Sequence, residues 1–166
     1  MHESRDQLIN WLNDAVGMEE NLVQVLEHQV NDFKNYPQVQ QQIQQHLEVT
    51  KGHADMVRQC VKDLGGSPST MKQAMGKIQG IFAGLGTGPA GDELVKNLLA
   101  DFASENFEIA CYTSLISACN EIGESSISSV CQRILSDEKA MAQKVLDAIP
   151  TLTTDYIVQK GHEKAA

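Results

Sequence analysis

Three glutamates interrupt the apolar faces of long helical segments, and their side chains could bind a metal ion. Glu19, Glu105 and Glu138 each occupy a position where residues spaced three and four apart are otherwise apolar, as on the buried face of a bundle helix. No Lys or Arg lies on these faces. Because an unpaired buried carboxylate is costly, the acids need a bound metal, shared protons, a charged histidine or a water-filled centre.

A histidine lies at the same level as the first of these acids. Tyr36 is in the turn that follows the first segment, with Glu19 17 residues before it and His53 17 residues after it. Two antiparallel helices joined at this turn would place the two side chains opposite each other. Imidazole nitrogen is a common ligand of divalent ions, so His53 is the candidate nitrogen ligand. The same measure places His46 nearer His28 than the acids.

The remaining acids meet when the second pair of segments is folded about its own turn. Glu138 lies 15 residues beyond Gly123 and comes opposite Glu108, with Glu105 one turn away. At a rise of about 1.5 Å per residue, each set falls within roughly one turn of a common level. We expect Glu108 and Asp137 to lie at the edge of the bundle rather than in its centre.

Composition and helix punctuation predict a single all-α domain over residues 1–166. Hydrophobic residues make up 42% of the chain and aromatic residues 5%, which is typical of a helical protein. Apolar periodicity, glycines and prolines delimit four long helices. The expected ranges are 3–33, 37–64, 92–123 and from the serines after 123 to 148, with Pro150 closing the fourth, a short final helix at 153–159 and a disordered tail after about 160.

The connection between the second and third long helices is the informative part of this order. It has about 26 residues, with an expected short helix at 68–83, a glycine-rich loop at 84–93 and Asp92 as the N-cap of the next helix. A connection of that length can cross the whole bundle. The second helical pair is therefore expected to enter from the opposite end.

Four stretches carry the acids and the histidines: GMEENL at 17–22, QHLEVTKGH at 45–53, ENFEIACYTSL at 105–115 and ILSDEKAMA at 134–142. They resemble the bacterial ferritin-like stress proteins YciE and YciF. The NYP turn at 35–37 and GDELVK at 91–96 are more similar to YciE. The resemblance implies a ferritin-like four-helix bundle with a long crossover connection, a homodimer, a cytoplasmic location and a role in stress responses.

The resemblance also implies a metal site, from which two residues depart. Ferritin-like centres take one Glu from each of two helices and a Glu-x-x-His motif from each of the other two. Thr50 stands where the second helix would supply its acid, and Met141 stands where the fourth would supply its histidine. Tyr112 is expected in the core with its hydroxyl bonded to a carboxylate. The ligands carried over by position are Glu19, His53, Glu105 and Glu138, with Glu108 as a further acid.

Three functions are compatible with these residues. The first is a ferritin-like stress-response protein with a degenerate, mononuclear site for iron or another divalent metal. The alternative is a metal-free, non-enzymatic helical dimer that acts through a protein partner. The third is an active di-iron oxidase or peroxidase, which the two departures disfavour because both a bridging acid and an imidazole are missing. The sequence assigns no enzymatic activity.

Charge and composition disfavour other classes of partner. The formal net charge is −9 and the 13 Lys and Arg residues are scattered, so nucleic acid is not expected to bind. No stretch is apolar enough to span a membrane, and MHESRDQLIN lacks the apolar centre of a signal peptide, so we expect a cytoplasmic protein without a membrane partner. The cysteines show no paired spacing and are expected to be buried free thiols: Cys60, Cys111, Cys119 and Cys131.

Overall fold

Four long helices make up the fold, as seen in a computed structural model that describes residues 2–33, 36–68 and 92–163. Their bounds are α1 His2–Asp32, α2 Pro37–Asp63, α4 Glu93–Ile122 and α5 Ser125–Glu163. The described residues contain no strand. The predicted all-α bundle of four long helices is confirmed. Nearly all of the expected short helix at 68–83, and the expected loop up to residue 91, lie outside the described residues.

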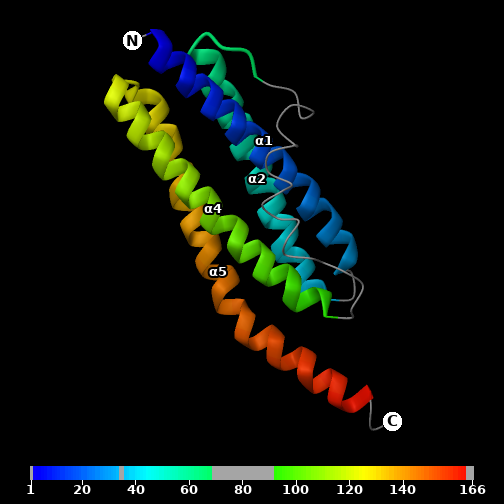
Figure 1. The fold of residues 1–166 in the computed structure, drawn as a ribbon. Coiled ribbons are helices and arrows are strands. Elements are labelled where there is room, and N and C mark those ends of the chain that lie inside the picture. The colour runs from blue at the N-terminus through cyan, green and yellow to red at the C-terminus, as the bar shows by residue number, and fades with distance from the viewer. Residues whose placement is uncertain (1, 34–35, 69–91, 164–166) are drawn as a thin grey trace.

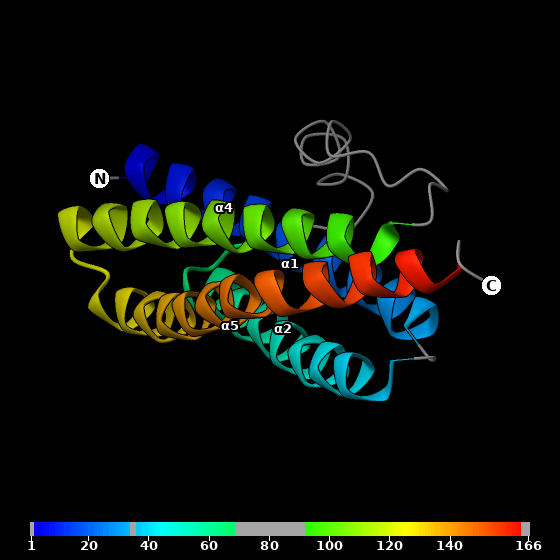
Figure 2. The same ribbon diagram turned by 90° about the horizontal axis from the view of Figure 1, so that it is seen from below.

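The helices pair into two antiparallel hairpins. α1 packs along α2 and α4 packs along α5, while α1 meets α4 and α2 meets α5 across the bundle (Figures 1 and 2). The end of α2 and the start of α4 lie at opposite ends of the bundle (Figure 1). The second hairpin therefore enters from the far end, as the length of the connection predicted.

Glycines end α2 and α4 in the same way. Gly65 and Gly123 have φ values of 78° and 81°, in the left-handed region that glycine adopts without strain. In each case the next amide donates to a carbonyl five residues earlier, Gly66 to Val61 at 2.9 Å and Glu124 to Cys119 at 2.8 Å. This pattern is a helix C-cap of the Schellman type. It sets where each helix stops relative to the polar side chains on its buried face.

The main apolar core fills the half of the bundle that carries the N-terminus. Its buried members come from the first two thirds of α1, the second halves of α2 and α4, and the first half of α5. Three of the four free thiols, of Cys60, Cys119 and Cys131, are buried there, while Cys111 is half-buried. The core contacts the polar centre through Tyr112. Its largest fully buried side chains include Leu8, Leu12, Val16, Met18, Val57, Val61, Ile127 and Ile134.

α5 continues through Pro150, so the prediction that this proline closes the helix is wrong. The helix includes the expected short helix at 153–159 and runs to Glu163, so the tail after 160 is helical as far as it is described. Proline lacks an amide donor and its ring crowds the carbonyl four residues earlier, here that of Leu146. The side chain of Leu146 is 43% exposed, and on this solvent side of the helix water can bond to the freed carbonyl.

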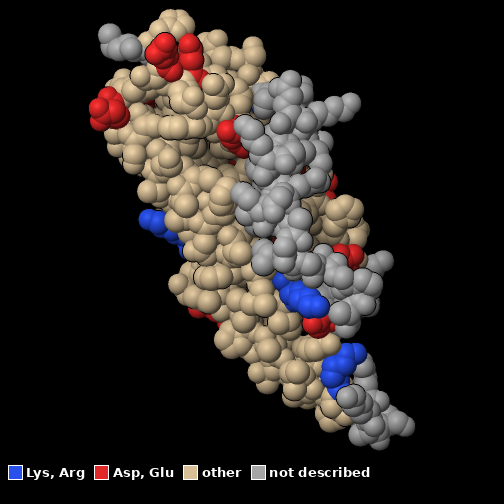
Figure 3. Space-filling model, in the orientation of Figure 1, with Lys and Arg blue, Asp and Glu red and all other residues tan. Residues whose placement is uncertain are grey.

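The surface shows charge of both signs. On the face in Figure 3, acidic side chains gather near the end that carries the N-terminus, and the visible Lys and Arg side chains lie apart from one another. Asp92 occupies the expected N-cap position of α4, but its carboxylate contacts Lys96 Nζ at 2.8 Å and does not cap the helix. Within the described ranges, none of the helices has an apolar run that could cross a bilayer.

Candidate metal centre

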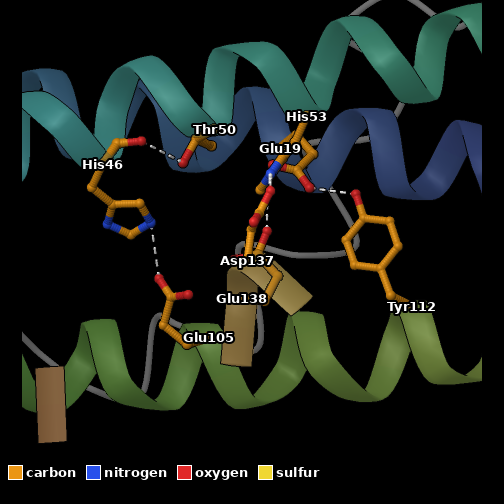
Figure 4. A network of polar contacts seen from close by, with 8 residues as sticks. All are labelled: Glu19, His46, Thr50, His53, Glu105, Tyr112, Asp137 and Glu138. Atoms are coloured by element: carbon orange, nitrogen blue, oxygen red, sulfur yellow. Dashed lines mark hydrogen bonds and ion pairs between the residues drawn. The ribbon is translucent and has the colours of Figure 1, made fainter. Parts of the chain in front are cut away.

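Polar side chains from all four helices meet near the middle of the bundle. α1 supplies Glu19, α2 supplies His46 and His53, α4 supplies Glu105 and Glu108, and α5 supplies Glu138 (Figure 4 shows all but Glu108). The glutamates and His53 are each 3% exposed or less, and His46 is 9% exposed. Carboxylates are rarely buried to this extent unless they are paired, protonated or bound to a metal.

Glu19, His53 and Glu138 form the first group of potential ligands. One donor atom from each lies within 4.8 Å of the other two. His53 Nδ1 is 2.7 Å from Glu138 Oε1, but neither atom has a hydrogen-bond partner, so the two atoms approach without the alignment of a hydrogen bond. Two ligands of one ion, each bound at about 2.1 Å, are themselves roughly 3 Å apart. The approach therefore suits two atoms that share an ion.

The second ring nitrogen of His53 contacts an acid outside this group. His53 Nε2 lies 3.2 Å from Oδ2 of Asp137, whose side chain is 47% exposed (Figure 4). A histidine that ligates a metal commonly donates its other N–H to a carboxylate, which fixes the ring and its tautomer. Asp137 lies at the edge of the bundle, as predicted, yet it can orient His53 there.

His46 and Glu105 form a second polar contact about two turns along α2. His46 Nε2 lies 3.1 Å from Glu105 Oε1. Between the two histidines, the hydroxyl of Thr50 donates to the carbonyl of His46 at 3.1 Å, so it is bonded to its own helix (Figure 4). A ferritin-like pattern would place an acid at position 50. The threonine found there only donates a hydrogen bond from its side chain to the backbone.

Tyr112 connects the first group to the apolar core. Its ring is fully buried, and its hydroxyl donates a short hydrogen bond to Oε1 of Glu19 (Figure 4). The prediction of a core tyrosine bonded to a carboxylate is confirmed. The other oxygen of Glu19 has no hydrogen-bond partner.

Burial shifts the proton affinity of the acids strongly. Burial, with the charge of Glu138, raises the pKa of Glu19 to about 8 and that of Glu105 to about 10. Burial also raises the pKa of Glu108 well above its ordinary value, and the charge of Glu19 adds to the shift. Without a metal, burial therefore favours the protonated form of all three acids.

The two histidines shift in opposite directions. Burial alone would lower the pKa of His53, but its contact with Glu138 outweighs burial and raises the pKa to about 9. Burial lowers the pKa of His46, although nearby acids oppose the shift. His53 is thus a cation in the metal-free centre, whereas His46 is neutral and meets a neutral Glu105.

The donor atoms of the centre fit a divalent ion. In the described part of the chain, one oxygen of each of the four buried glutamates lacks a hydrogen-bond partner, namely Oε2 of Glu19, Glu105 and Glu108 and Oε1 of Glu138. Buried polar atoms are seldom left unsatisfied, because each costs on the order of 1–3 kcal/mol. Carboxylate oxygens and imidazole nitrogens together suit iron(II), manganese(II) and zinc.

The structure corrects two placements made from the sequence. His46 was expected nearer His28 than the acids, and it instead contacts Glu105. Glu108 was expected at the edge of the bundle, and it is 1% exposed. Both errors arise because folding one hairpin about its turn fixes heights within that hairpin but not the offset and rotation of the other. The structure brings the predicted residues Glu19, His53 and Glu138 into one group and Glu105 beside it.

Solved structures with the same architecture include one that is described with a diiron site. A protein from Xanthomonas campestris pv. campestris is 26% identical with a TM-score of 0.81, covering 96% of this chain and 99% of that one. The Escherichia coli stress protein YciF is 21% identical with a TM-score of 0.76, covering 93% and 99%. The bacterioferritin of Desulfovibrio desulfuricans, described with a diiron site, is 19% identical with a TM-score of 0.76, covering 92% and 83%.

These likenesses define the class of the protein as a ferritin-like four-helix bundle, as the sequence predicted. Residues 3–158 match the family described as Domain of unknown function (DUF892), and the chain belongs to that family. The likeness to YciF agrees with the predicted resemblance to YciE and YciF at the level of the family. The closer similarity to YciE stays a prediction.

Proposed function

We propose that this protein is a ferritin-like stress-response protein that binds a divalent transition metal, such as iron(II), in the middle of its bundle. The observation that carries the proposal is the convergence of Glu19, His53 and Glu138, whose donor atoms lie within 4.8 Å of one another in a buried setting. The diiron site of the similar bacterioferritin supports a metal in this fold. The similarity to YciF, a stress protein, supports the physiological role.

Each residue has a distinct part in holding the ion. Glu19 and Glu138 supply carboxylate oxygens, and His53 supplies Nδ1. Asp137 accepts the N–H of the opposite ring nitrogen, so the lone pair of Nδ1 is free for the ion once His53 has lost its second proton. Tyr112 holds one oxygen of Glu19 and leaves the other for the ion. When bound, the ion supplies positive charge and, if it is iron, one-electron redox chemistry.

Two ligand positions of the general ferritin-like pattern are occupied by other residues in this chain. Metal binding is therefore a better supported function than efficient oxidation by a di-iron site. Thr50 offers a hydroxyl that is already bonded to a carbonyl, and Met141 offers a thioether, which suits copper(I) better than iron. A bridging acid and an imidazole of the general ferritin-like pattern are thereby replaced. The site is in this sense degenerate.

Calorimetric titration of chelator-treated protein with iron(II), manganese(II) and zinc, under anaerobic conditions for iron, tests the proposal. The wild-type chain should bind at least one ion, and the double variant Glu19→Gln, His53→Ala should bind at least 100-fold more weakly, since two ligands are lost. His28→Ala, on the exposed face of α1, is the matched control and should bind like wild type. Failure of the wild-type chain to bind any of the three ions would reject the proposal in favour of a metal-free bundle.

A further inference from the structure

Two free thiols lie in the apolar core on the two arms of the α4–α5 hairpin. Cys119 belongs to α4 and Cys131 to α5, and these two helices lie side by side up to the turn that joins them (Figure 1). Both side chains are fully buried in the same apolar cluster. Neither thiol has a part in the metal centre, so their placement needs an account of its own.

The register of the hairpin brings the two thiols to one level. Cys119 follows Tyr112 by seven residues, which is about two turns along the same face of α4. Cys131 precedes Glu138 by seven residues, which is about two turns along the same face of α5. Tyr112 and Glu138 both lie at the polar centre. The two thiols are therefore at equal distances from that centre, on faces that meet.

Contacts nearer the turn hold the two sulfurs together. Oγ of Ser128 donates to Oδ1 of Asn120 at 2.8 Å, from α5 to α4, so the register is fixed on this side of the pair as well. The thiol of Cys131 donates a hydrogen bond to the sulfur of Cys119. Two hydrogen-bonded sulfurs need to approach by only about 2 Å to reach the length of an S–S bond.

The hydrogen bond makes Cys119 the more reactive of the buried thiols. A thiolate attacks an oxidant much faster than a thiol, and burial disfavours the thiolate. Burial raises the pKa of Cys60, which lies in the same core, to about 11. The hydrogen bond from Cys131 lowers the pKa of Cys119 in spite of burial, because an S–H donor stabilises the thiolate beside it. The pKa of Cys131 rises because it gives that hydrogen bond and is itself buried.

We infer that Cys119 and Cys131 are a modification site at which hydrogen peroxide forms a reversible disulfide between α4 and α5. In the first step, the thiolate of Cys119 attacks one oxygen of the peroxide. An S–O bond forms and the O–O bond breaks, so that the sulfur is oxidised to a sulfenic acid and the peroxide is reduced. The hydroxide that leaves takes up the proton that Cys119 had lost and becomes water.

The second step closes the cross-link. The sulfur of Cys131 attacks the sulfur of Cys119, so the S–S bond forms and the S–O bond breaks. The hydroxyl group leaves with the proton of Cys131 as a second water molecule. Two thiols and one peroxide are thereby converted to one disulfide and two molecules of water. A dithiol reverses the change by thiol–disulfide exchange.

Access to the pair sets the rate of the reaction. Both sulfurs are fully buried, so peroxide reaches them only when the hairpin opens locally. Cys119 lies in the last turn of α4, and helix ends open more readily than helix centres. Peroxide is small and uncharged, so a brief opening admits it. The reaction is therefore slower than that of an exposed thiol, and its product is set by the partner that faces Cys119.

Treatment of the reduced, full-length protein with hydrogen peroxide, in the presence of a chelator, tests the inference. Free thiols are counted in urea before and after treatment, and linked peptides are identified by mass spectrometry. Wild-type protein should lose two of its four thiols. It should yield a peptide linked through Cys119 and Cys131, and dithiothreitol should restore both thiols.

Three variants assign the two steps to their residues. Cys119→Ser should give no linked peptide, because the attacking sulfur is missing. Cys131→Ser keeps a hydrogen-bond donor but cannot form the S–S bond, so the reaction should stop at a sulfenic acid on Cys119, which dimedone traps. Cys60→Ala is the matched control from the same core and should form the same linked peptide as wild type.

Wild-type protein that keeps all four thiols after treatment would overturn the inference, and so would a cross-link through Cys60 or between two chains. Because a chelator is present throughout, these results are independent of whether the proposed metal centre binds an ion. Circular dichroism checks that the variants are folded. If a serine variant does not fold, the thiol count and the linked peptide of the wild-type protein decide the question without it.

Discussion

Tyr112 is the residue through which the apolar core reaches the polar centre. Its hydroxyl donates to Glu19, and both side chains are fully buried. Replacing Tyr112 with Phe would leave both oxygens of Glu19 without a hydrogen-bond partner. We expect the free energy of unfolding of the metal-free protein to fall by about 1–3 kcal/mol, measured by urea denaturation.

Tyr36→Phe is the control for this change. The hydroxyl of Tyr36 contacts Gln159 at 3.4 Å in an exposed setting, so its loss should change the free energy of unfolding by less than about 0.5 kcal/mol. The same two variants also report on metal binding, since only Tyr112 touches a proposed ligand. If the two substitutions lower the free energy of unfolding equally, the buried hydrogen bond of Tyr112 stabilises the protein no more than the exposed one of Tyr36.

Asp137 acts on the centre through His53 rather than by direct contact with an ion. Its carboxylate lies 3.2 Å from Nε2 of His53. Asp137→Asn removes the charge that favours an N–H at this nitrogen, so the ring is held less firmly for metal binding through Nδ1. We expect the dissociation constant of manganese(II) to rise by about 10-fold or more.

Asp147→Asn serves as the reference for this measurement. Asp147 lies on the same helix and accepts a hydrogen bond from Gln143 at 2.7 Å, but it is exposed. Like Asp137→Asn, Asp147→Asn removes one negative charge, so comparing the two variants corrects the measured affinity for the general effect of charge on cation binding. If Asp147→Asn weakens binding as much as Asp137→Asn does, the orientation of His53 is not the cause.

At the scale of the helices, glycine serves two opposite purposes in this chain. Gly52 lies inside α2, and a Cβ added there would meet nothing within 4 Å. Gly123 ends α4 with φ at 81°, where an L side chain is strained. Gly52→Ala should therefore raise the free energy of unfolding by about 0.5–1 kcal/mol, while Gly123→Ala should lower it by about 1 kcal/mol or more. Urea denaturation in the presence of a chelator measures both.

The opposite signs make this pair of variants a test of helix assignment. Stabilisation by Gly123→Ala would mean that α4 and α5 form one continuous helix rather than a hairpin. Destabilisation by Gly52→Ala would mean that α2 is bent at Gly52. Because Gly52 precedes His53, metal affinity of Gly52→Ala should be checked as well, and no change is expected.

The helices were predictable because their signals are local. Apolar spacing gave the four long helices, and Gly65 and Gly123 marked two of their ends. Pro150 misled the prediction, because a proline ends a helix only when the freed carbonyl and the ring cannot be accommodated. At the solvent side of α5 they can be, so the helix continues.

The centre was predictable only in part, for a geometric reason. Heights measured from each turn placed His53 beside Glu19 correctly, since both belong to one hairpin. The contact between His46 and Glu105 joins two hairpins, and their relative offset depends on how all four buried faces pack. No pattern in a single helix encodes that offset. The burial of Glu108 was missed for the same reason.

For the molecule as a whole, the buried acids make stability depend on pH. The pKa of Glu19 rises from 4.5 to about 8 on folding, that of Glu105 rises from 4.5 to about 10, and that of His53 rises from 6.5 to about 9. Above pH 4.5 the unfolded chain releases protons that the folded chain keeps. Folding then takes up protons, so the free energy of unfolding must fall as pH rises through this window.

We expect the metal-free protein to lose on the order of a few kcal/mol of stability between about pH 6 and about pH 9, measured by urea denaturation in a chelator. The double variant Glu19→Gln, Glu105→Gln should show a much smaller loss, because its amides do not titrate. A wild-type stability that is constant or rises over this range would contradict the burial of protonated acids at the centre.

A bound metal should reverse this dependence. The ion binds the deprotonated forms of His53 and Glu19, so at low pH it must displace protons, and at high pH fewer remain to be displaced. Metal affinity therefore rises with pH, and the stabilisation by a fixed excess of ion rises with it. The unfolding temperature is measured against pH with and without manganese(II). The difference between the two curves should grow from about pH 6 to about pH 8. The two curves would run parallel if manganese(II) bound only to exposed carboxylates, whose ordinary pKa values leave them ionised throughout this range.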